Sequence, residues 1–164
     1  MDFAAQEQRK EVKKENYMEV HMDARPENES LARLTVAGFL AQMNPTLEVV
    51  SDIKTAVSEA VTNAIIHGYQ WKEGMQTTGK VHIFCKRRDS LFEVEIRDDG
   101  CGIADVALAM EPLYTSRPDL ERSGMGFSFM EAFMDELEVE SVLEQGTRVK
   151  MKRNIEKDDG LGEE

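Results

Sequence analysis

The hydrophobic positions along the chain follow a strand-like period first and a helical period afterwards. Residues 17–23 alternate between apolar and polar side chains, which predicts a strand. Over residues 26–43 the apolar positions recur at roughly helical spacing after an initial proline, which predicts a helix. A second helix is expected over residues 47–67, because its apolar positions fit a period of about 3.6 residues and Thr46 can cap it.

In the second half of the chain, the hydrophobic pattern changes to a period of two. Alternating runs are separated by turn-forming residues, which predicts hairpins. The predicted elements are strands at 81–85 and 92–96, a helix at 126–134, and strands at 137–142 and 147–153. Because the strands are joined mainly by hairpins, we predict an α+β fold. It would be a two-layer sandwich with a mixed, mostly antiparallel sheet and helices on one face.

Composition predicts one folded domain between two flexible tails. The chain has 164 residues, of which 41% are hydrophobic, and this suits a single core. Residues 1–16 are polar and residues 155–164 are acidic, so both segments are expected to be flexible. The folded domain is expected to span residues 17–154.

The charge balance narrows the class of protein. Against 32 Asp and Glu there are 20 Lys and Arg, a formal net charge of −12, which argues against direct binding to nucleic acid. No apolar run approaches the roughly 18 residues of a membrane span, and the N-terminus has no signal-peptide core. Cys85 and Cys101 are too few for a disulfide framework. We therefore expect a cytoplasmic protein with no membrane partner.

Residues 74–80 have the glycine and lysine spacing of a phosphate-binding P-loop. A working P-loop follows a strand, opens a helix and places Ser or Thr after its lysine to hold magnesium. Here the run follows a predicted helix, opens a predicted strand and is followed by Val81. We interpret it as an ordinary loop.

Glu59, Asn63 and His67 lie four residues apart in the second predicted helix and therefore share one face. They could form a polar stripe on the surface of an amphipathic helix. However, apolar neighbours indicate that much of this helix is buried, where an unpartnered carboxylate is costly. In the functional interpretation, Glu59 is a base and the Asn63 amide oxygen holds Mg²⁺, which takes few protein ligands when nucleotide phosphates supply the others.

A run of aspartates and glycines at residues 98–102 directly follows a predicted strand. Asp and Gly are common turn residues, so a simple turn is one interpretation. In the functional interpretation, the Asp98 carboxylate accepts a hydrogen bond from an exocyclic amine such as that of adenine. Gly100 and Gly102 would then let the backbone approach the ring.

A third cluster, residues 122–127, opens the short predicted helix. Free backbone N–H groups at a helix start bind phosphate, and Arg122 adds a positive charge. The residues expected at the phosphates are Ser123, Gly124, Met125, Gly126 and Phe127. Phe129 stands where a dinucleotide-binding fold has its third glycine, which disfavours that fold.

Residues 104–121, between the second and third clusters, contain two prolines and have no clean period. Loops of this length in a compact domain are often active-site lids. We expect such a lid, with Thr115 and Ser116 near its middle.

The order of these clusters is more specific than any one of them. Together with Gly146-Thr147 in the last hairpin, it resembles the nucleotide-binding domain shared by gyrase, histidine kinases and the mismatch-repair protein MutL, the Bergerat or GHKL fold. A closer resemblance lies in residues 28–33, 58–69 and 121–127. These runs resemble the anti-sigma F factors of spore-forming bacteria, which are serine kinases of the stage II sporulation AB type.

This resemblance implies ATP and Mg²⁺ as cofactors. It implies that Glu59 and Arg122 are catalytic, that Asn63 binds the metal ion, and that Asp98 and Thr147 lie at the adenine. It further implies a homodimer that holds sigma factor F inactive when adenine nucleotide is bound. The same dimer would phosphorylate a serine of an anti-anti-sigma factor.

Arg33, in the first predicted helix, is the residue expected to bind partners. We expect Leu31 and Leu34 to face the core, which leaves Arg33 turned towards solvent. A lone Arg on an amphipathic helix is usually only solvated. The resemblance implies instead that the partners compete for a surface around Arg33, whose planar guanidinium can pair with a carboxylate.

Two other classes of function stay open at this point. One is a non-catalytic, nucleotide-gated binding module, and the other is a structural α/β interaction domain. The four ordered motifs argue against the structural domain. Glu59 favours the kinase over the gated module, because holding magnesium and phosphates needs Asn63 but no base.

Overall fold

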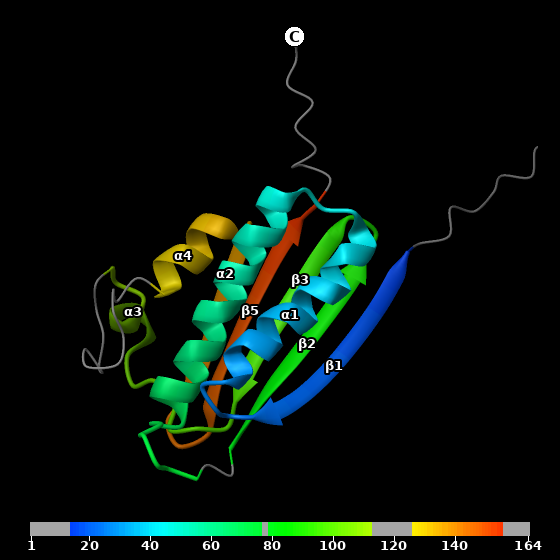
Figure 1. Cartoon of the computed structure of the whole chain (residues 1–164). Helices are drawn as coiled ribbons and strands as arrows, with labels where there is room; N and C mark the ends of the chain where they lie inside the picture. Colours follow the sequence, from blue (N-terminus) through cyan, green and yellow to red (C-terminus); the bar gives the residue numbers. More distant parts are fainter. Residues whose placement is uncertain (1–13, 77–78, 113–125, 156–164) are drawn as a thin grey trace, which may run out of the picture.

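The computed structural model describes residues 14–76, 79–112 and 126–155, and these form a five-stranded sheet with helices packed on it (Figure 1). Among these residues, no helix is both long and apolar enough to cross a membrane. The elements in chain order are β1 (Glu15–Asp23), α1 (Asn28–Leu40), α2 (Leu47–Asn63), β2 (Lys80–Arg88), β3 (Leu91–Asp98), α3 (Val106–Ala109), α4 (Gly126–Phe133), β4 (Glu136–Val142) and β5 (Gly146–Asn154).

The strand order is β1-β2-β3-β5-β4, and each of these neighbouring pairs is antiparallel. Helices α1, α2 and α4 lie over one face of the sheet (Figure 1). This confirms the predicted α+β architecture with helices on one face. The strand bounds agree with the alternating runs to within a few residues, although β1 begins at Glu15 rather than at residue 17.

Alternation along the strands separates an apolar face from a charged face. The inward side chains of β2 and β3 are fully or almost fully buried: Val81, Ile83, Cys85, Phe92, Val94 and Ile96. On the opposite face, charged side chains pair across strands, as Arg148 does with Glu140 at 2.7 Å and Lys150 with Glu93 at 3.4 Å. A one-residue shift in register would reverse these faces, so burial fixes the pairing.

Helix α2 begins where the sequence predicts but ends differently. The Thr46 hydroxyl accepts a hydrogen bond from the backbone N–H of Val49 at 3.2 Å and so caps the first turn. The predicted helix continues to residue 67, whereas the structure changes to a wider π-helical turn over Ala64–Gly68. There the Tyr69 N–H bonds to the Ala64 carbonyl at 3.0 Å. Such turns occur frequently at functional sites.

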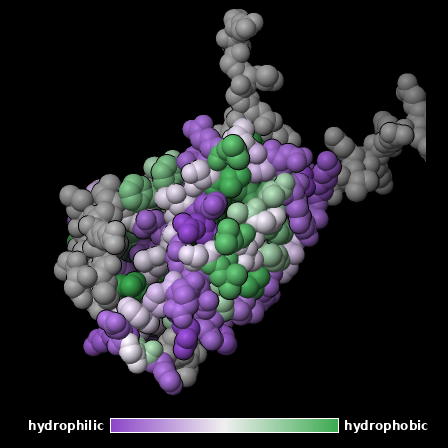
Figure 2. All heavy atoms as spheres, in the orientation of Figure 1, coloured by the Kyte–Doolittle hydropathy of each residue, from purple (hydrophilic) through white to green (hydrophobic). Residues whose placement is uncertain are grey.

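The expected orientation of α1 is wrong. Its buried residues are Ala32, Val36, Phe39 and Leu40. Leu31 and Leu34 are instead 52% and 62% exposed, and they contribute to an apolar surface over α1 (Figure 2). The reason is that helical spacing fixes the period but not which of two adjacent stripes faces inward, and here the stripe that begins at small Ala32 packs inward. Arg33 has 39% of its side chain exposed, and its Nε lies 3.8 Å from the carboxylate of Glu29, one turn before it.

The P-loop-like run is not followed by a helix. Lys80 begins β2, and its ammonium pairs with the Asp23 carboxylate at 2.9 Å at the end of β1. This agrees with its interpretation as a loop that opens a strand. Residues 77–78 of the run lie outside the described residues.

Candidate functional site

A cavity of about 340 Å³ lies beside α2, α4 and the ends of β3 and β5. Its volume falls in the range of small-molecule sites, roughly 300–1,000 Å³. The predicted site residues among those that line it are Asn63, Asp98, Gly102, Gly126, Phe127 and Thr147. The fold therefore brings together side chains that are far apart in the sequence.

Asp98 is the buried acceptor of this cavity. It ends β3, its residue surface is 4% exposed, and it accepts a hydrogen bond from the Gly100 N–H at 2.9 Å. Burial raises the pKa of this carboxyl to about 6, although the backbone N–H groups of Gly100 and Thr147 act in the opposite direction. A ligand that donates a hydrogen bond here would favour the ionised carboxylate.

Two glycines bring the π-helical turn into direct contact with the loop after Asp98. A Cβ atom added at Gly100 would lie 2.0 Å from the Gly68 carbonyl oxygen, and one added at Gly68 would lie 2.8 Å from the Asp98 carboxyl. The Cys101 N–H donates to the same Gly68 carbonyl at 2.8 Å. Gly102 has a φ of +74°, which other residues rarely adopt. These positions therefore need glycine for reasons of space and conformation.

Ser141 is a site residue that the sequence reasoning missed. Its hydroxyl lies 2.8 Å from the Thr147 hydroxyl and accepts a hydrogen bond from the Ile103 N–H at 2.7 Å. Ser141 thus joins the last hairpin to the segment that borders the cavity. The predicted hairpin around residues 144–146 could have indicated it, because that turn places Ser141 opposite Thr147.

Glu59 and Asn63 lie where α4 approaches α2. A Cβ atom added at Gly126 would lie 3.2 Å from Oε2 of Glu59 and 3.4 Å from Nδ2 of Asn63. Asn63 and His67 also line the cavity, as their common helix face predicts. Glu59 is not among the residues that line the cavity; it lies one turn before Asn63 on the same helix and close to Gly126, which does line it. A carboxylate and an amide are thus placed together beside the start of α4.

Several predicted residues lie outside the described part of the chain. Residues 113–125 contain both lid residues, Thr115 and Ser116, and most of the phosphate cluster, namely Arg122, Ser123, Gly124 and Met125. Of that cluster, Gly126 and Phe127 are described and line the cavity. Arg33 lies on α1 and is not among the residues that line it.

The residues present fit an adenine nucleotide. The cavity combines a buried acceptor at Asp98 with apolar side chains such as Ile96, Val149 and Ile103, which suits a flat ring with an amine. Within the described residues, no group of three or more His, Cys, Asp or Glu could hold a metal ion. Asn63 places an amide at the cavity, and an amide oxygen is a suitable ligand for Mg²⁺.

Comparison with known proteins identifies the class and then the family. A family model described as the histidine kinase-like ATPase domain matches residues 22–153, which are more than half of the chain, so the chain contains an ATPase domain of this class. An anti-sigma F factor of Clostridium botulinum is 55% identical over 141 residues, which are 86% of this chain and 96% of that protein. An anti-sigma F factor of Geobacillus thermodenitrificans is 50% identical, over 89% of this chain and 97% of that protein. The chain belongs to the anti-sigma F factor family.

A solved structure agrees on the fold. The crystal structure of the RsbU and RsbW domains of a Mycobacterium tuberculosis protein superposes with a TM-score of 0.61 at 18% sequence identity. The match covers 85% of this chain and 32% of that longer chain. It supports the two-layer architecture independently of the sequence relatives.

Proposed function

We propose that the protein is an ATP-dependent protein-serine kinase that also acts as an anti-sigma factor. The observation that carries this proposal is the buried Asp98 carboxylate in a cavity bordered by the Asn63 face of α2. The name of the relatives supports sigma factor F as the sequestered partner. The phosphoacceptor would be a serine of an anti-anti-sigma factor.

Adenine specificity follows from the chemistry of Asp98. The exocyclic amine of adenine donates a hydrogen bond, which a carboxylate accepts. Guanine presents a carbonyl oxygen at the corresponding position, so two acceptors would face each other in a buried place. The unpaired polar groups would cost more there than in water. We therefore propose ATP rather than GTP as the nucleotide.

Asn63 and the start of α4 are proposed to hold the phosphate end of ATP. The Asn63 amide oxygen would bind Mg²⁺, and the bound ion would neutralise charge on the phosphates. Gly126 and Phe127, together with the expected residues 122–125, would supply backbone N–H groups to the phosphates. Arg122 would stabilise charge on the transferred group.

Glu59 is proposed as the base of the transfer. Its carboxylate would accept the proton of the attacking serine hydroxyl while the serine oxygen bonds to the γ-phosphorus. The bond between that phosphorus and ADP breaks in the same step. The position of Glu59 beside Gly126 and one turn from Asn63 supports this role.

Arg33 is proposed to contact the protein partners, in a cytoplasmic homodimer with no direct nucleic-acid or membrane partner. Its side chain is 39% exposed beside the Glu29 carboxylate, and α1 also exposes Leu31 and Leu34. Exposed charge and exposed apolar area on one helix suit protein recognition, because the apolar area provides affinity and the charge provides specificity.

The decisive experiment compares Glu59→Gln with wild type, using labelled ATP and the serine-bearing partner. We expect the variant to bind ATP nearly as wild type and to lose about 10²–10⁴-fold in phosphoryl transfer. Glu48→Gln is the matched control, because Glu48 is exposed on the same helix. Phosphoryl transfer by Glu59→Gln at the wild-type rate would show that Glu59 has only a structural role. If wild type transfers no phosphate but binds partners only with ATP, the protein is a nucleotide-gated module instead.

A further inference from the structure

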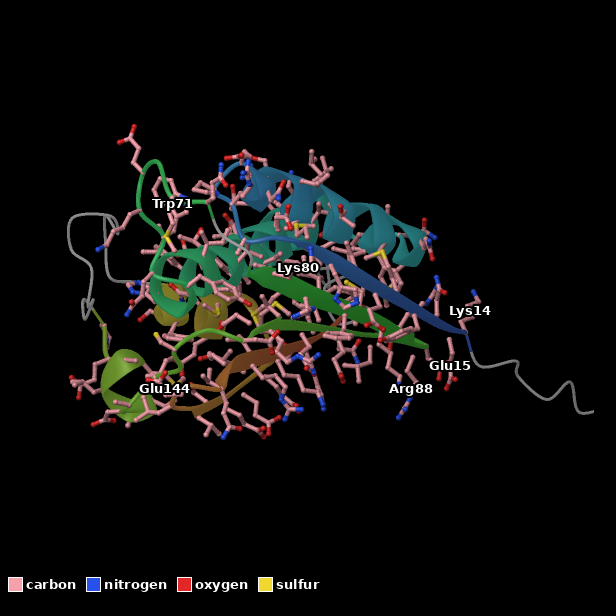
Figure 3. All side chains as sticks on the ribbon, turned by 90° about the horizontal axis from the view of Figure 1, so that it is seen from below. Lys14, Glu15, Trp71, Lys80, Arg88 and Glu144 are labelled. Atoms are coloured by element: carbon pink, nitrogen blue, oxygen red, sulfur yellow. The ribbon has the colours of Figure 1, made fainter. Side chains whose placement is uncertain are left out.

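Two histidines face each other on the face of the sheet away from the helices. They lie near the start of β2, which Lys80 marks in Figure 3. His21 on β1 pairs directly with His82 on β2, so their side chains project from the same face. Their Nδ1 atoms are 2.5 Å apart, and the rings meet edge to face with centroids 4.8 Å apart. Neither residue belongs to the cavity described above.

Each histidine is held by a carboxylate on its other nitrogen. Nε2 of His21 lies 2.7 Å from the Glu19 carboxylate, and Nε2 of His82 lies 2.8 Å from the Asp99 carboxylate. A carboxylate only accepts, so each Nε2 carries the hydrogen. In a neutral ring this leaves Nδ1 with a lone pair. The two Nδ1 atoms, 2.5 Å apart, form a hydrogen bond in which one Nδ1–H donates to the lone pair of the other.

We propose that His21 and His82 form a binding site for a divalent transition-metal ion such as Zn²⁺ or Ni²⁺. An ion that displaces the proton shared by the two rings would take the lone pairs of both Nδ1 atoms, and imidazole nitrogen is a preferred ligand of these ions. Metal-bound histidines usually donate their second N–H to a carboxylate, and Glu19 and Asp99 already occupy those places. Both ligands and their supporting carboxylates are thus preformed.

The geometry needs little adjustment for an ion. Zinc–nitrogen distances of about 2.0–2.1 Å in a tetrahedral site separate two nitrogens by about 3.3 Å. The rings must therefore open by less than about 1 Å. The His21 side chain is 42% exposed, so the remaining coordination positions are open to water.

The surrounding charges allow a cation. The nearest carboxylates, Glu19 and Asp99, are anionic. Arg97 is directly opposite His82 in the register, but its guanidinium lies over the Phe84 ring, 5.0 Å from the centroid. The Lys80 ammonium is paired with Asp23.

Calorimetric titration of the nucleotide-free full chain with Zn²⁺ and with Ni²⁺ tests the site. All variants carry Cys101→Ser, which removes the partly exposed thiol as a competing ligand. We expect saturable binding of one ion per chain and at least about tenfold weaker binding after His21→Gln or His82→Gln. Glu19→Gln should weaken binding by about 10–100-fold while leaving both ligands in place. His67→Gln is the control and should bind the metal as the parent does.

Long-range ¹H–¹⁵N spectra of the histidines give a second readout that a folding defect cannot imitate. With metal, both Nδ1 signals should show coordination while both Nε2 atoms stay protonated. Unchanged affinity in the His21 and His82 variants would overturn the proposal. So would the absence of saturable binding, which would leave a shared proton between the two rings.

Discussion

At the scale of single residues, Asp98 is the residue proposed to recognise the adenine of ATP. Asp98→Asn keeps the shape but replaces one acceptor oxygen with a donor that would face the adenine amine. We expect ATP affinity to fall by about 10–100-fold, since hydrogen bonds to charged groups contribute about 1.5–3 kcal/mol. Calorimetry with ATP measures this change.

The same chemical change at an exposed turn is the control for Asp98→Asn. Asp89 has a φ of 52°, a conformation that Asn also adopts, so Asp89→Asn should leave both stability and ATP affinity unchanged. Equal ATP affinity for Asp98→Asn and Asp89→Asn would remove the adenine assignment.

The pKa of Asp98 also predicts how stability depends on pH. Because burial raises this pKa from 3.8 to about 6, the folded state holds the proton more tightly than the unfolded chain. The contribution of Asp98 to stability is therefore fully present below about pH 4 and is lost as pH rises through 6. Relative to Asp98→Asn, wild type should lose about 2 kcal/mol of unfolding free energy between pH 4 and pH 7.5. Urea unfolding of both proteins from pH 4 to 7.5 checks this; a pH-independent difference would contradict it.

Some site residues are predictable one by one, and others are not. Asp98 and Asn63 stand out because a polar residue at a strand end or on a mostly apolar helix needs a reason to be there. Ser141 does not stand out, because a serine in an exposed strand is unremarkable until its register partner Thr147 is known. The role of Arg33 is implied by the resemblance to the family alone, whereas Glu59 is a candidate base from its place on a mostly apolar helix.

At the scale of elements, the contact between the π-helical turn and the loop after β3 controls stability and binding together. Gly100→Ala would place a Cβ atom 2.0 Å from the Gly68 carbonyl oxygen, so one backbone segment must move. We expect a loss of about 1–3 kcal/mol in unfolding free energy and weaker ATP binding, because Asp98 moves with the loop.

Gly38→Ala is the matched control for this backbone effect. Gly38 lies inside α1, and a Cβ atom there meets no heavy atom within 4 Å. This change should raise the unfolding free energy by about 0.4–1 kcal/mol, because alanine restricts the unfolded chain. Urea titration measures the change in unfolding free energy for both variants. The two changes should have opposite signs if the packing argument is right, and the same sign if it is wrong.

Helix α1 is the element on which partner binding is predicted to depend. Arg33→Glu reverses the charge on its exposed surface without touching the cavity. We expect about 10–100-fold weaker binding of sigma factor F, of the anti-anti-sigma factor, or of both, with ATP affinity unchanged. Arg25→Glu, an equal charge change at an exposed position before the helix, should have little effect. Normal binding of both partners by Arg33→Glu would exclude the assignment.

Periodicity predicts which elements form but leaves their orientation and ends open. It placed both long helices and all five strands, because period two and period 3.6 are distinct signals. It put Leu31 and Leu34 on the wrong side of α1, where two neighbouring apolar stripes compete. It also missed the π-helical turn, because that turn depends on contact between Gly68 and Gly100, which are remote in sequence.

At the scale of the whole molecule, the strand order determines at which stage of synthesis the nucleotide cavity can be completed. β5 lies between β3 and β4, so the sheet cannot be completed until one of the last segments of the described chain has been made. Thr147 on β5 pairs with Asp98 on β3, although the two residues are far apart in the sequence. Strand pairs between such distant segments form slowly during folding. A nascent chain that already carries α1, α2 and β3 therefore has no finished nucleotide cavity. We therefore expect nucleotide binding only in chains in which β5 has been made and has paired with β3.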